Sequence, residues 1–243
     1  MYKKTIMGVM VGIALATSLA MAEDVPADLG DKLKPMFGGS APDSLKATPL
    51  ANIFEAKFGG EIIYVSGDAR YVFVGDLIDA QTKSSLTEAS RSADRQGIMK
   101  TIDASKTIEF KAKGDEKHVL YVFTDVDCPF CVKMHKEVPA LNEAGVTVRY
   151  LAYPRAGVGS PAYKKMVNIW CADNKQEAMT KVKNGETIET KECTNPVADD
   201  FALGQKLGVN GTPALVTADG LMIPGFRPAA DLVKMLDAAP KAK

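Results

Sequence analysis

A Cys-x-x-Cys motif, Cys128-Pro-Phe-Cys131, is the feature that most constrains this chain. It follows a short apolar run, residues 119–123, and precedes a segment with helical spacing that begins at Val132. A cysteine at the mouth of a helix lies where unpaired backbone N–H groups and the helix dipole favour an anion. Such a site lowers the pKa of the first thiol, and the thiolate is the form that attacks disulfides. The motif therefore predicts thiol–disulfide exchange.

The two sulfurs of the motif are expected to have different roles. Residues i and i+3 share one face of a helix, so the sulfurs can form a disulfide and open it again. We expect Cys128 to be an exposed nucleophile and Cys131 to be a buried resolving thiol. Pro129 suits the first turn, because its missing N–H would have no helical partner there. The alternatives are a static disulfide or half of a zinc site with His135, although the chain has only 2 histidines and no second close cysteine pair.

The first 22 residues are typical of a cleavable secretory signal. Lys3 and Lys4 form a positive start, residues 6–19 form an apolar core, and Ala20-Met-Ala22 matches an A-x-A cleavage site. An uncleaved membrane anchor is the alternative, but the apolar stretch is shorter than the roughly 20 residues that a spanning helix needs. All 4 cysteines lie beyond this segment, which suits an oxidising compartment such as a bacterial periplasm.

Length and charge exclude some classes of function. The full chain has 243 residues, with 30 basic and 30 acidic side chains and a formal net charge of zero. The charges are interspersed, and nucleic-acid binding would require a basic patch. The chain beyond the signal is long enough for one large domain or two modest ones.

The region before the motif is expected to hold a small domain and a linker. An amphipathic helix over residues 23–37 and a Pro- and Ser-rich loop precede three short strands, at 53–58, 61–65 and 70–74, which form an antiparallel meander. This segment has little room for its own core, so it packs on the rest of the chain or pairs with a second copy. Residues 84–105 are polar and predict a solvent-exposed helix linking two domains, capped by Ser85 or Thr87.

The region from residue 106 onwards has an alternating pattern of strands and helices. A strand at 118–125, a helix at 129–143 and a strand at 146–152 predict a right-handed parallel crossover. The remaining expected elements are helices at 161–173, 176–183 and 196–207, an antiparallel hairpin at 213–217 and 221–223, and a last helix at 228–238. This order is that of a thioredoxin-like fold with a helical insertion.

Three further features accompany the dithiol. Pro213, at the start of a strand, is a candidate cis proline whose preceding residue, Thr212, could offer backbone groups to a substrate strand; a trans proline is the alternative. Asp125 and Asp127 flank Cys128, and one of them could accept a proton from Cys131 during release of a mixed disulfide. If Cys128 pairs with Cys131, Cys171 and Cys193 remain to form a structural disulfide or a second redox couple. Loop closure by a structural disulfide would stabilise the fold by roughly 3 kcal/mol.

The motifs together resemble the DsbC/DsbG family of periplasmic thiol:disulfide isomerases. They are Glu116-Lys-His-Val, Phe123-Thr-Asp-Val-Asp-Cys-Pro-Phe-Cys131, Val148-Arg-Tyr-Leu-Ala-Tyr-Pro-Arg155, Ile169-Trp-Cys171, Leu207-Gly-Val-Asn-Gly-Thr-Pro213 and Gly225. In this family, Cys128 and Cys131 match the redox pair, and Thr212 and Pro213 match the cis-proline loop. Cys171 and Cys193 match a structural disulfide of the DsbC branch.

The resemblance implies a fold of the mixed α+β / α/β class in four parts. Residues 1–22 would be the signal peptide, 23–84 an antiparallel β dimerisation domain, 85–105 a linker helix and 106–243 a thioredoxin-like catalytic domain. It also implies a V-shaped homodimer whose cleft holds misfolded exported proteins with non-native disulfides. A membrane reductase of the DsbD type would keep the dithiol reduced, and no cofactor, metal or nucleic acid would take part.

Other assignments remain open from the sequence. The dipeptide Pro129-Phe130 is closer to that of the DsbG branch, a reductase or chaperone, whereas the extra cysteine pair favours the DsbC branch. A DsbA-like thiol oxidase is a further alternative, although the N-terminal segment and the linker argue against it. A holdase chaperone with secondary thiols is an alternative from another class of function.

Overall fold

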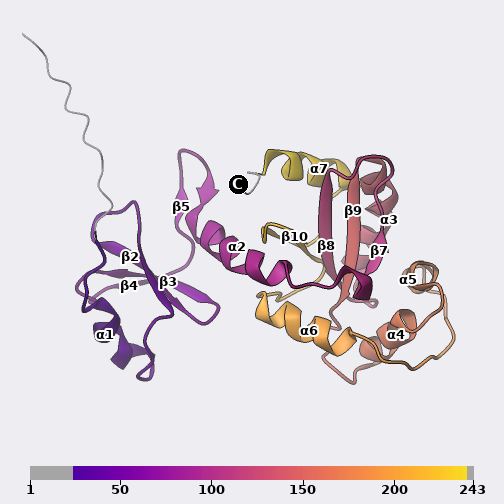
Figure 1. The fold of residues 1–243 in the computed structure, drawn as a ribbon, viewed down its shortest axis with the longest axis horizontal. Helices are drawn as coiled ribbons and strands as arrows, with labels where there is room; N and C mark the ends of the chain where they lie inside the picture. The colour runs from indigo at the N-terminus through magenta and orange to yellow at the C-terminus, as the bar shows by residue number, and fades with distance from the viewer. Residues whose placement is uncertain (1–23, 240–243) are drawn as a thin grey trace, which may run out of the picture. The chain divides into compact units, whose positions relative to one another are not determined.

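The computed structural model describes residues 24–239, which divide into two compact units between Val74 and Gly75 (Figure 1). The predicted secretory signal, residues 1–22, lies outside the described residues. Each unit has a hydrophobic core of its own. The boundary between the units falls before residue 84, where the sequence analysis places the end of the N-terminal domain.

The N-terminal unit is a four-stranded antiparallel sheet with a short helix. The strands lie in chain order and are β1 (Ser44–Ala47), β2 (Ile53–Phe58), β3 (Glu61–Ser66) and β4 (Val72–Val74). The helix α1 (Leu29–Leu33) continues into a 3₁₀ turn, η1 (Lys34–Phe37), and is shorter than the helix expected over 23–37. The meander is confirmed, with β1 as an added edge strand in a segment that the sequence analysis assigned to a loop.

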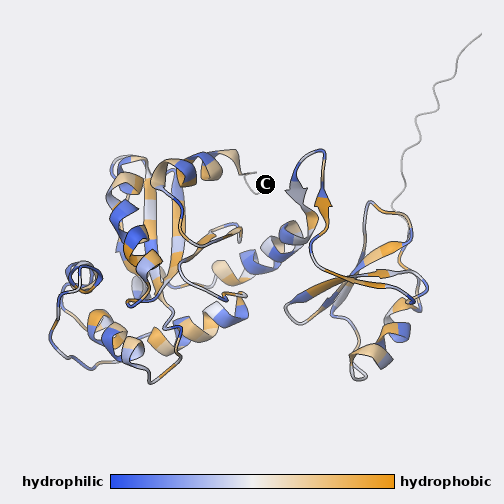
Figure 2. Cartoon of the chain, turned by 180° about the vertical axis from the view of Figure 1, so that it is seen from behind, coloured by the Kyte–Doolittle hydropathy of each residue, from blue (hydrophilic) through white to orange (hydrophobic). Residues whose placement is uncertain are grey.

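The core of this unit lies between α1 and one face of the sheet. Leu29 and Leu33 are fully buried and pack against Phe54 and Val65 of the central strands. Figure 2 shows these strands as largely hydrophobic. The unit therefore buries a real but small core, as its length predicts.

The second unit begins with a hairpin and a long helix. The hairpin consists of β5 (Ile78–Asp79) and β6 (Ser84–Ser85), and α2 (Leu86–Met99) comes directly after it. Ser85 caps α2, because its hydroxyl accepts a hydrogen bond from the Glu88 N–H at 3.0 Å. The prediction that Ser85 can start this helix is confirmed.

The α2 helix packs on the second unit and is not exposed all round. Much of its surface is hydrophilic (Figure 2), yet Arg95 is buried. The Arg95 guanidinium donates to the carbonyl oxygens of Leu207, at 3.2 Å, and Gly220, at 3.1 Å. The expectation of a solvent-exposed helix is wrong at this point, because a polar side chain can be buried where backbone carbonyls satisfy its donors.

A five-stranded mixed sheet forms the centre of the second unit. Its order is β11-β10-β8-β9-β7, and β8 runs parallel to β9 while the other neighbours are antiparallel. The strands are β7 (Ile108–Phe110), β8 (His118–Thr124), β9 (Val146–Ala152), β10 (Ala214–Thr217) and β11 (Met222–Pro224). The parallel crossover and the C-terminal hairpin are confirmed, and β7 is a further strand that the sequence analysis did not identify.

Five helices come after β8 in the chain and cover the sheet. They are α3 (Pro129–Glu143), α4 (Pro161–Trp170), α5 (Lys175–Lys183), α6 (Val197–Lys206) and α7 (Ala229–Ala238). Alternate residues of β8 and β9 serve two separate cores, because successive side chains of a strand point to opposite faces. Leu120 and Val122 pack with α3 and α7, whereas Tyr121 and Phe123 pack with α6 and the end of α2.

No helix within residues 24–239 has the length and apolar character that crossing a membrane requires.

Candidate functional site

The dithiol lies at the junction of β8 and α3. Cys128 is the N-cap residue of α3, with extended backbone, and its carbonyl accepts the Val132 N–H at 3.1 Å. Pro129 occupies the first turn, where its missing N–H leaves nothing unpaired. Both Cys128 and Cys131 are free thiols. The structure therefore places this pair at a helix N-terminus, in the arrangement that the sequence predicts.

Cys128 is buried, which differs from the exposed nucleophile that the sequence analysis expects. The residue is 2% exposed, whereas its neighbour Phe130 is 54% exposed. The reason is the loop before β10, where the Thr212 carbonyl accepts a hydrogen bond from the Cys128 Sγ at 3.2 Å. The reactive sulfur is therefore covered from one side by backbone.

The two thiols have pKa values shifted in opposite directions. Burial opposes ionisation of Cys128, but the hydrogen bonds that the Thr212 hydroxyl and the backbone N–H groups of Cys131 and Phe130 can donate to its thiolate outweigh it, so the pKa is lowered. Burial dominates at Cys131 and raises the pKa of that thiol. The Cys128 thiol is therefore expected to ionise more readily than the Cys131 thiol.

The Thr212–Pro213 loop lies beside the dithiol because of strand pairing. The peptide bond between Thr212 and Pro213 is cis, as the sequence analysis suggests. β10 begins at Ala214, which pairs with Phe123 near the end of β8, and this register brings the loop to the start of α3. The Thr212 Oγ1 atom is buried and has no hydrogen-bond partner among the described residues, so a thiolate at Cys128 would give its hydroxyl an acceptor.

The Asp125 carboxylate is directed away from Cys131. Its Oδ2 atom accepts from the backbone N–H and the Nε of Arg155, at 2.9 and 3.1 Å, and its Oδ1 atom accepts from the Asp127 N–H. Only the backbone N–H of Asp125 reaches the Cys131 Sγ, at 3.5 Å. These contacts indicate that the carboxylate holds the loop in place. They argue against the proton transfer that was proposed from the sequence.

His135 belongs to the core beneath the motif. Its ring nitrogens contact the Tyr150 hydroxyl at 3.0 Å and the Thr180 hydroxyl at 3.1 Å. Burial, together with the nearby Lys183 ammonium, lowers the pKa of His135 to about 4. The imidazole is therefore neutral at physiological pH, and both of its nitrogens are already engaged by hydroxyl groups.

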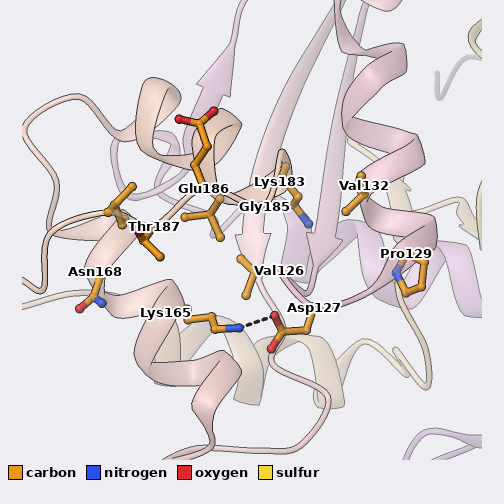
Figure 3. A pocket seen from close by; sticks show the side chains of 12 residues that line it. Val126, Asp127, Pro129, Val132, Lys165, Asn168, Lys183, Gly185, Glu186 and Thr187 are labelled. Carbon is orange, nitrogen blue, oxygen red and sulfur yellow. Dashed lines mark hydrogen bonds and ion pairs between the residues drawn. The ribbon is translucent and has the colours of Figure 1, made fainter.

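A cavity of about 500 Å³ lies beside the dithiol helix (Figure 3). Pro129 and Val132 of α3 line one side, and the ion pair between Asp127 and Lys165, with 2.7 Å between its atoms, lies on another. Lys183 also lines this cavity and was not singled out by the sequence analysis. No motif marks it, because its position depends on how α5 packs.

Cys171 and Cys193 form a disulfide with their Cα atoms 5.6 Å apart. Cys171 caps the end of α4, and Cys193 lies in the extended segment before α6. The bridge therefore ties the segment between α5 and α6 to α4, inside the helical insertion. Its position favours the structural bridge over the second redox couple.

Two family models match adjoining parts of the chain. A thioredoxin-like domain matches residues 106–240, and the N-terminal domain of disulfide bond isomerase proteins matches residues 20–88. The fold and the dithiol at the start of α3 agree with these matches. The protein is thus a thiol–disulfide oxidoreductase with a thioredoxin-like domain.

Similar proteins narrow this class. The thiol:disulfide interchange protein DsbC of Escherichia coli strain K12 is 32% identical over 95% of this chain and 95% of its own length. DsbC of Pasteurella multocida is 37% identical over 78% of this chain and 82% of its own length. A crystal structure of a disulfide interchange protein from Neisseria gonorrhoeae is 32% identical, with a TM-score of 0.50, and covers 56% of this chain and 96% of that one. This chain belongs to the DsbC family, which confirms the resemblance and the fold class drawn from the sequence.

Proposed function

We propose that this protein is a periplasmic disulfide isomerase that also reduces incorrect disulfides in exported proteins. The observation that carries the proposal is the placement of the dithiol at the start of α3, with Cys128 as the N-cap residue 3.2 Å from the Thr212 carbonyl and Cys131 buried one turn further on. This placement is accompanied by a lowered pKa at Cys128 and a raised pKa at Cys131. A lowered pKa suits the nucleophile, because the thiolate is the attacking form. A raised pKa suits the resolving thiol, because it stays protonated until the mixed disulfide has formed. Attack on the substrate disulfide and release of the mixed disulfide are both exchanges between sulfur atoms, so no cofactor is required.

Catalysis begins with attack of the Cys128 thiolate on a substrate disulfide. One S–S bond breaks, a bond forms between Cys128 and the substrate, and the other substrate sulfur leaves as a thiolate. If another substrate thiolate then attacks the mixed disulfide, Cys128 is released and the substrate has isomerised. If Cys131 attacks instead, two electrons pass to the substrate, and the enzyme is left with a Cys128–Cys131 disulfide.

The loop at Thr212 and Pro213 is the proposed contact for the substrate backbone. The Thr212 carbonyl lies 3.2 Å from the Cys128 Sγ, so a chain bound along this loop would bring its disulfide to the nucleophile. Cys171 and Cys193 are proposed to be structural and to keep their disulfide during turnover.

A homodimer is proposed through the N-terminal domain. β4 is an edge of its sheet, and an edge strand offers unpaired backbone groups to another chain. Phe73 and Val74 on this strand, and Tyr71 just before it, are large apolar side chains that are 54%, 76% and 54% exposed. Exposed apolar side chains on an open edge are typical of a protein interface.

We retain the domain roles and the compartment that were inferred from the sequence as part of this proposal. Residues 1–22 would be removed on export to the periplasm, 23–84 would dimerise, 85–105 would connect the domains, and 106–243 would carry the catalysis. A match to a thioredoxin-like domain from residue 106 supports the last assignment. Reductive turnover consumes the dithiol, so a reducing partner, proposed to be a membrane reductase of the DsbD type, must restore it.

Recovery of activity by scrambled ribonuclease in a glutathione buffer tests the isomerase proposal. The mature protein is expected to restore ribonuclease activity, and Cys128→Ala is expected to abolish this effect. Rapid oxidation of reduced ribonuclease without recovery from the scrambled form would identify a DsbA-like oxidase instead. Prevention of aggregation by a Cys128→Ala, Cys131→Ala protein, without recovery by the parent, would favour a DsbG-like chaperone.

A further inference from the structure

Lys183 is a buried lysine that the exchange steps described above do not use. It is the last residue of α5 and is 3% exposed. Its Nζ donates to the Thr124 Oγ1 at 2.9 Å and to the Asp125 carbonyl oxygen at 2.8 Å. Both acceptors are uncharged, and burial lowers the pKa of the amine. Burial of an ammonium group on neutral partners is costly, and such groups are concentrated at functional sites.

The two residues that hold Lys183 also contact the resolving thiol. The Asp125 N–H lies 3.5 Å from the Cys131 Sγ, and the Thr124 side chain lowers the pKa of the same thiol by a hydrogen bond. Thr124 and Asp125 therefore lie between the ammonium and the sulfur. Figure 3 shows Lys183 next to Val126 and Val132, at the base of the dithiol helix.

We propose that Lys183 is a positioning residue for the resolving thiol. The positive charge of Lys183 favours the Cys131 thiolate when the mixed disulfide must be released. The ammonium acts through Thr124 and Asp125 and does not touch the reacting sulfurs. This inference rests on the proposed roles of Cys128 and Cys131. It adds a residue from the helical insertion to a site otherwise built by β8, α3 and the Thr212 loop.

Among the charged groups around Cys131, Lys183 is the one that most favours ionisation of this thiol. After burial, which opposes ionisation, the attraction of Lys183 is the largest influence on the pKa of Cys131. The Arg155 cation is nearby, but its Nε is bonded to the Asp125 carboxylate. The charged and titratable groups that surround Cys131 and Lys183 are Cys128, Asp125, Asp127, His135, Tyr150 and Arg155.

The assisted step is the release of substrate from Cys128. Cys131 loses its proton, its sulfur bonds to the Cys128 sulfur, and the bond between Cys128 and the substrate breaks. The substrate sulfur leaves as a thiolate and takes up a proton, so protons and electrons balance. Without Lys183, Cys131 would ionise at higher pH, and release would be slower near neutral pH.

Titration of Cys131 in a Cys128→Ala background tests the charge directly. Thiolate absorbance is measured against pH in full-length protein with Lys183, with Lys183→Met and with Lys183→Gln. Both substitutions are expected to raise the midpoint by about one pH unit or more, because each removes the cation. Lys181→Met, which changes an exposed lysine on the same helix, is the matched control and is expected to leave the midpoint in place. A midpoint that Lys183→Met does not move overturns the proposal.

Release of glutathione from a mixed disulfide with Cys128 tests the consequence. Lys183→Met is expected to slow release about tenfold near neutral pH and to match the parent at high pH, where Cys131 is ionised in both. Equal slowing at every pH would indicate disturbed packing and would contradict the proposal. A Cys131→Ala protein that releases glutathione at the parent rate would instead refute the resolving role of Cys131, so the two failures are distinguishable.

Discussion

At the scale of single residues, the site is governed by how buried polar groups find partners. Cys128 and Cys131 belong to one motif, yet hydrogen bonds lower the pKa of the first thiol and burial raises that of the second. Arg95 and His135 are buried because carbonyls or hydroxyls satisfy their nitrogens. The chemical type of a residue therefore predicts what it can do, while its neighbours decide which form it takes.

Asp200 allows the balance between burial and hydrogen bonding to be tested by the pH dependence of stability. Burial raises its pKa to about 7, although its Oδ2 accepts the Ala152 N–H at 3.0 Å. Because the folded pKa exceeds the unfolded value, the folded state binds the proton more tightly, and stability is expected to fall as pH rises from about 4 to about 7.

Asp200→Asn should remove this contribution, since an amide stays uncharged and its oxygen can accept the same hydrogen bond. At pH 8 the variant is expected to be more stable than the parent by roughly 2–4 kcal/mol, and at pH 4 the two should converge. Denaturant unfolding across this range measures the difference. Asp219→Asn, at an exposed position whose charge does not act on Asp200, is the control; an Asp200→Asn curve parallel to that of the parent would refute the argument.

At the scale of elements, α2 and the helical insertion are held by contacts that their own patterns do not reveal. The α2 helix has the polar composition of an exposed linker, yet it docks through Arg95 on the backbone of Leu207 and Gly220. A Cβ atom on Gly220 would clash with the Ser92 carbonyl oxygen, so the helix approaches the β10–β11 turn closely. The insertion is similarly tied down by the Cys171–Cys193 disulfide.

Arg95→Ala is expected to loosen α2 and to destabilise the unit by about 2–4 kcal/mol, because it removes the donor to two carbonyls and the cation paired with the Glu88 carboxylate. Hydrogen exchange should show lost protection along α2 before any loss in β8 and β9. Arg91→Ala, which removes an exposed pair with Asp76, should change stability by less than about 1 kcal/mol. Unaltered exchange in Arg95→Ala would show that the docking is held by other groups.

Removal of the Cys171–Cys193 disulfide should lower stability without removing the chemistry. The bridge closes a loop over a separation of 22 residues, so the Cys171→Ala, Cys193→Ala protein is expected to lose about 3 kcal/mol in the free energy of unfolding. Denaturant unfolding measures this loss. Reduction of insulin by the variant should continue at a rate near that of the parent; complete loss of reductase activity would point to a redox role for the pair.

At the scale of the whole molecule, the two units differ in what they could contribute to the proposed function. One carries the dithiol on a five-stranded sheet, and the other has a small core and an open edge at β4. A domain of this size gains stability by burying further apolar surface against a partner. The exposed side chains Phe73 and Val74 are the surface available for this purpose.

Phe73→Glu with Val74→Glu is therefore expected to convert a dimer into a monomer. The charges would be buried without partners in the interface, which costs several kcal/mol. Light scattering gives the mass of each form. Val158→Glu, at an apolar position that is 58% exposed in the catalytic unit, should stay dimeric. A parent that is monomeric at all concentrations tested would refute the dimer.

The redox motif, the parallel crossover and the order of the main helices could all be predicted from the amino-acid sequence. These features depend on local spacing, turn residues and hydrophobic periodicity, which a chain carries whatever its neighbours are. Cys128, Cys131 and the Thr212–Pro213 loop could be identified in this way, because each belongs to a short recognisable pattern.

Only the tertiary structure decided the environment of these residues. The burial of Cys128 depends on the register of β10 beside β8, and the placement of Lys183 beneath Cys131 depends on the packing of α5. β1 and β7 were not identified, because their short segments, Ser-Leu-Lys-Ala and Ile-Glu-Phe, lack a distinctive run of β-branched and aromatic residues. They form strands because they pair with β2 and β9. Such features arise from contacts between distant segments, which local patterns do not encode. The motif therefore predicts which thiol ionises more readily, and the distant contacts supply the groups that surround each thiol.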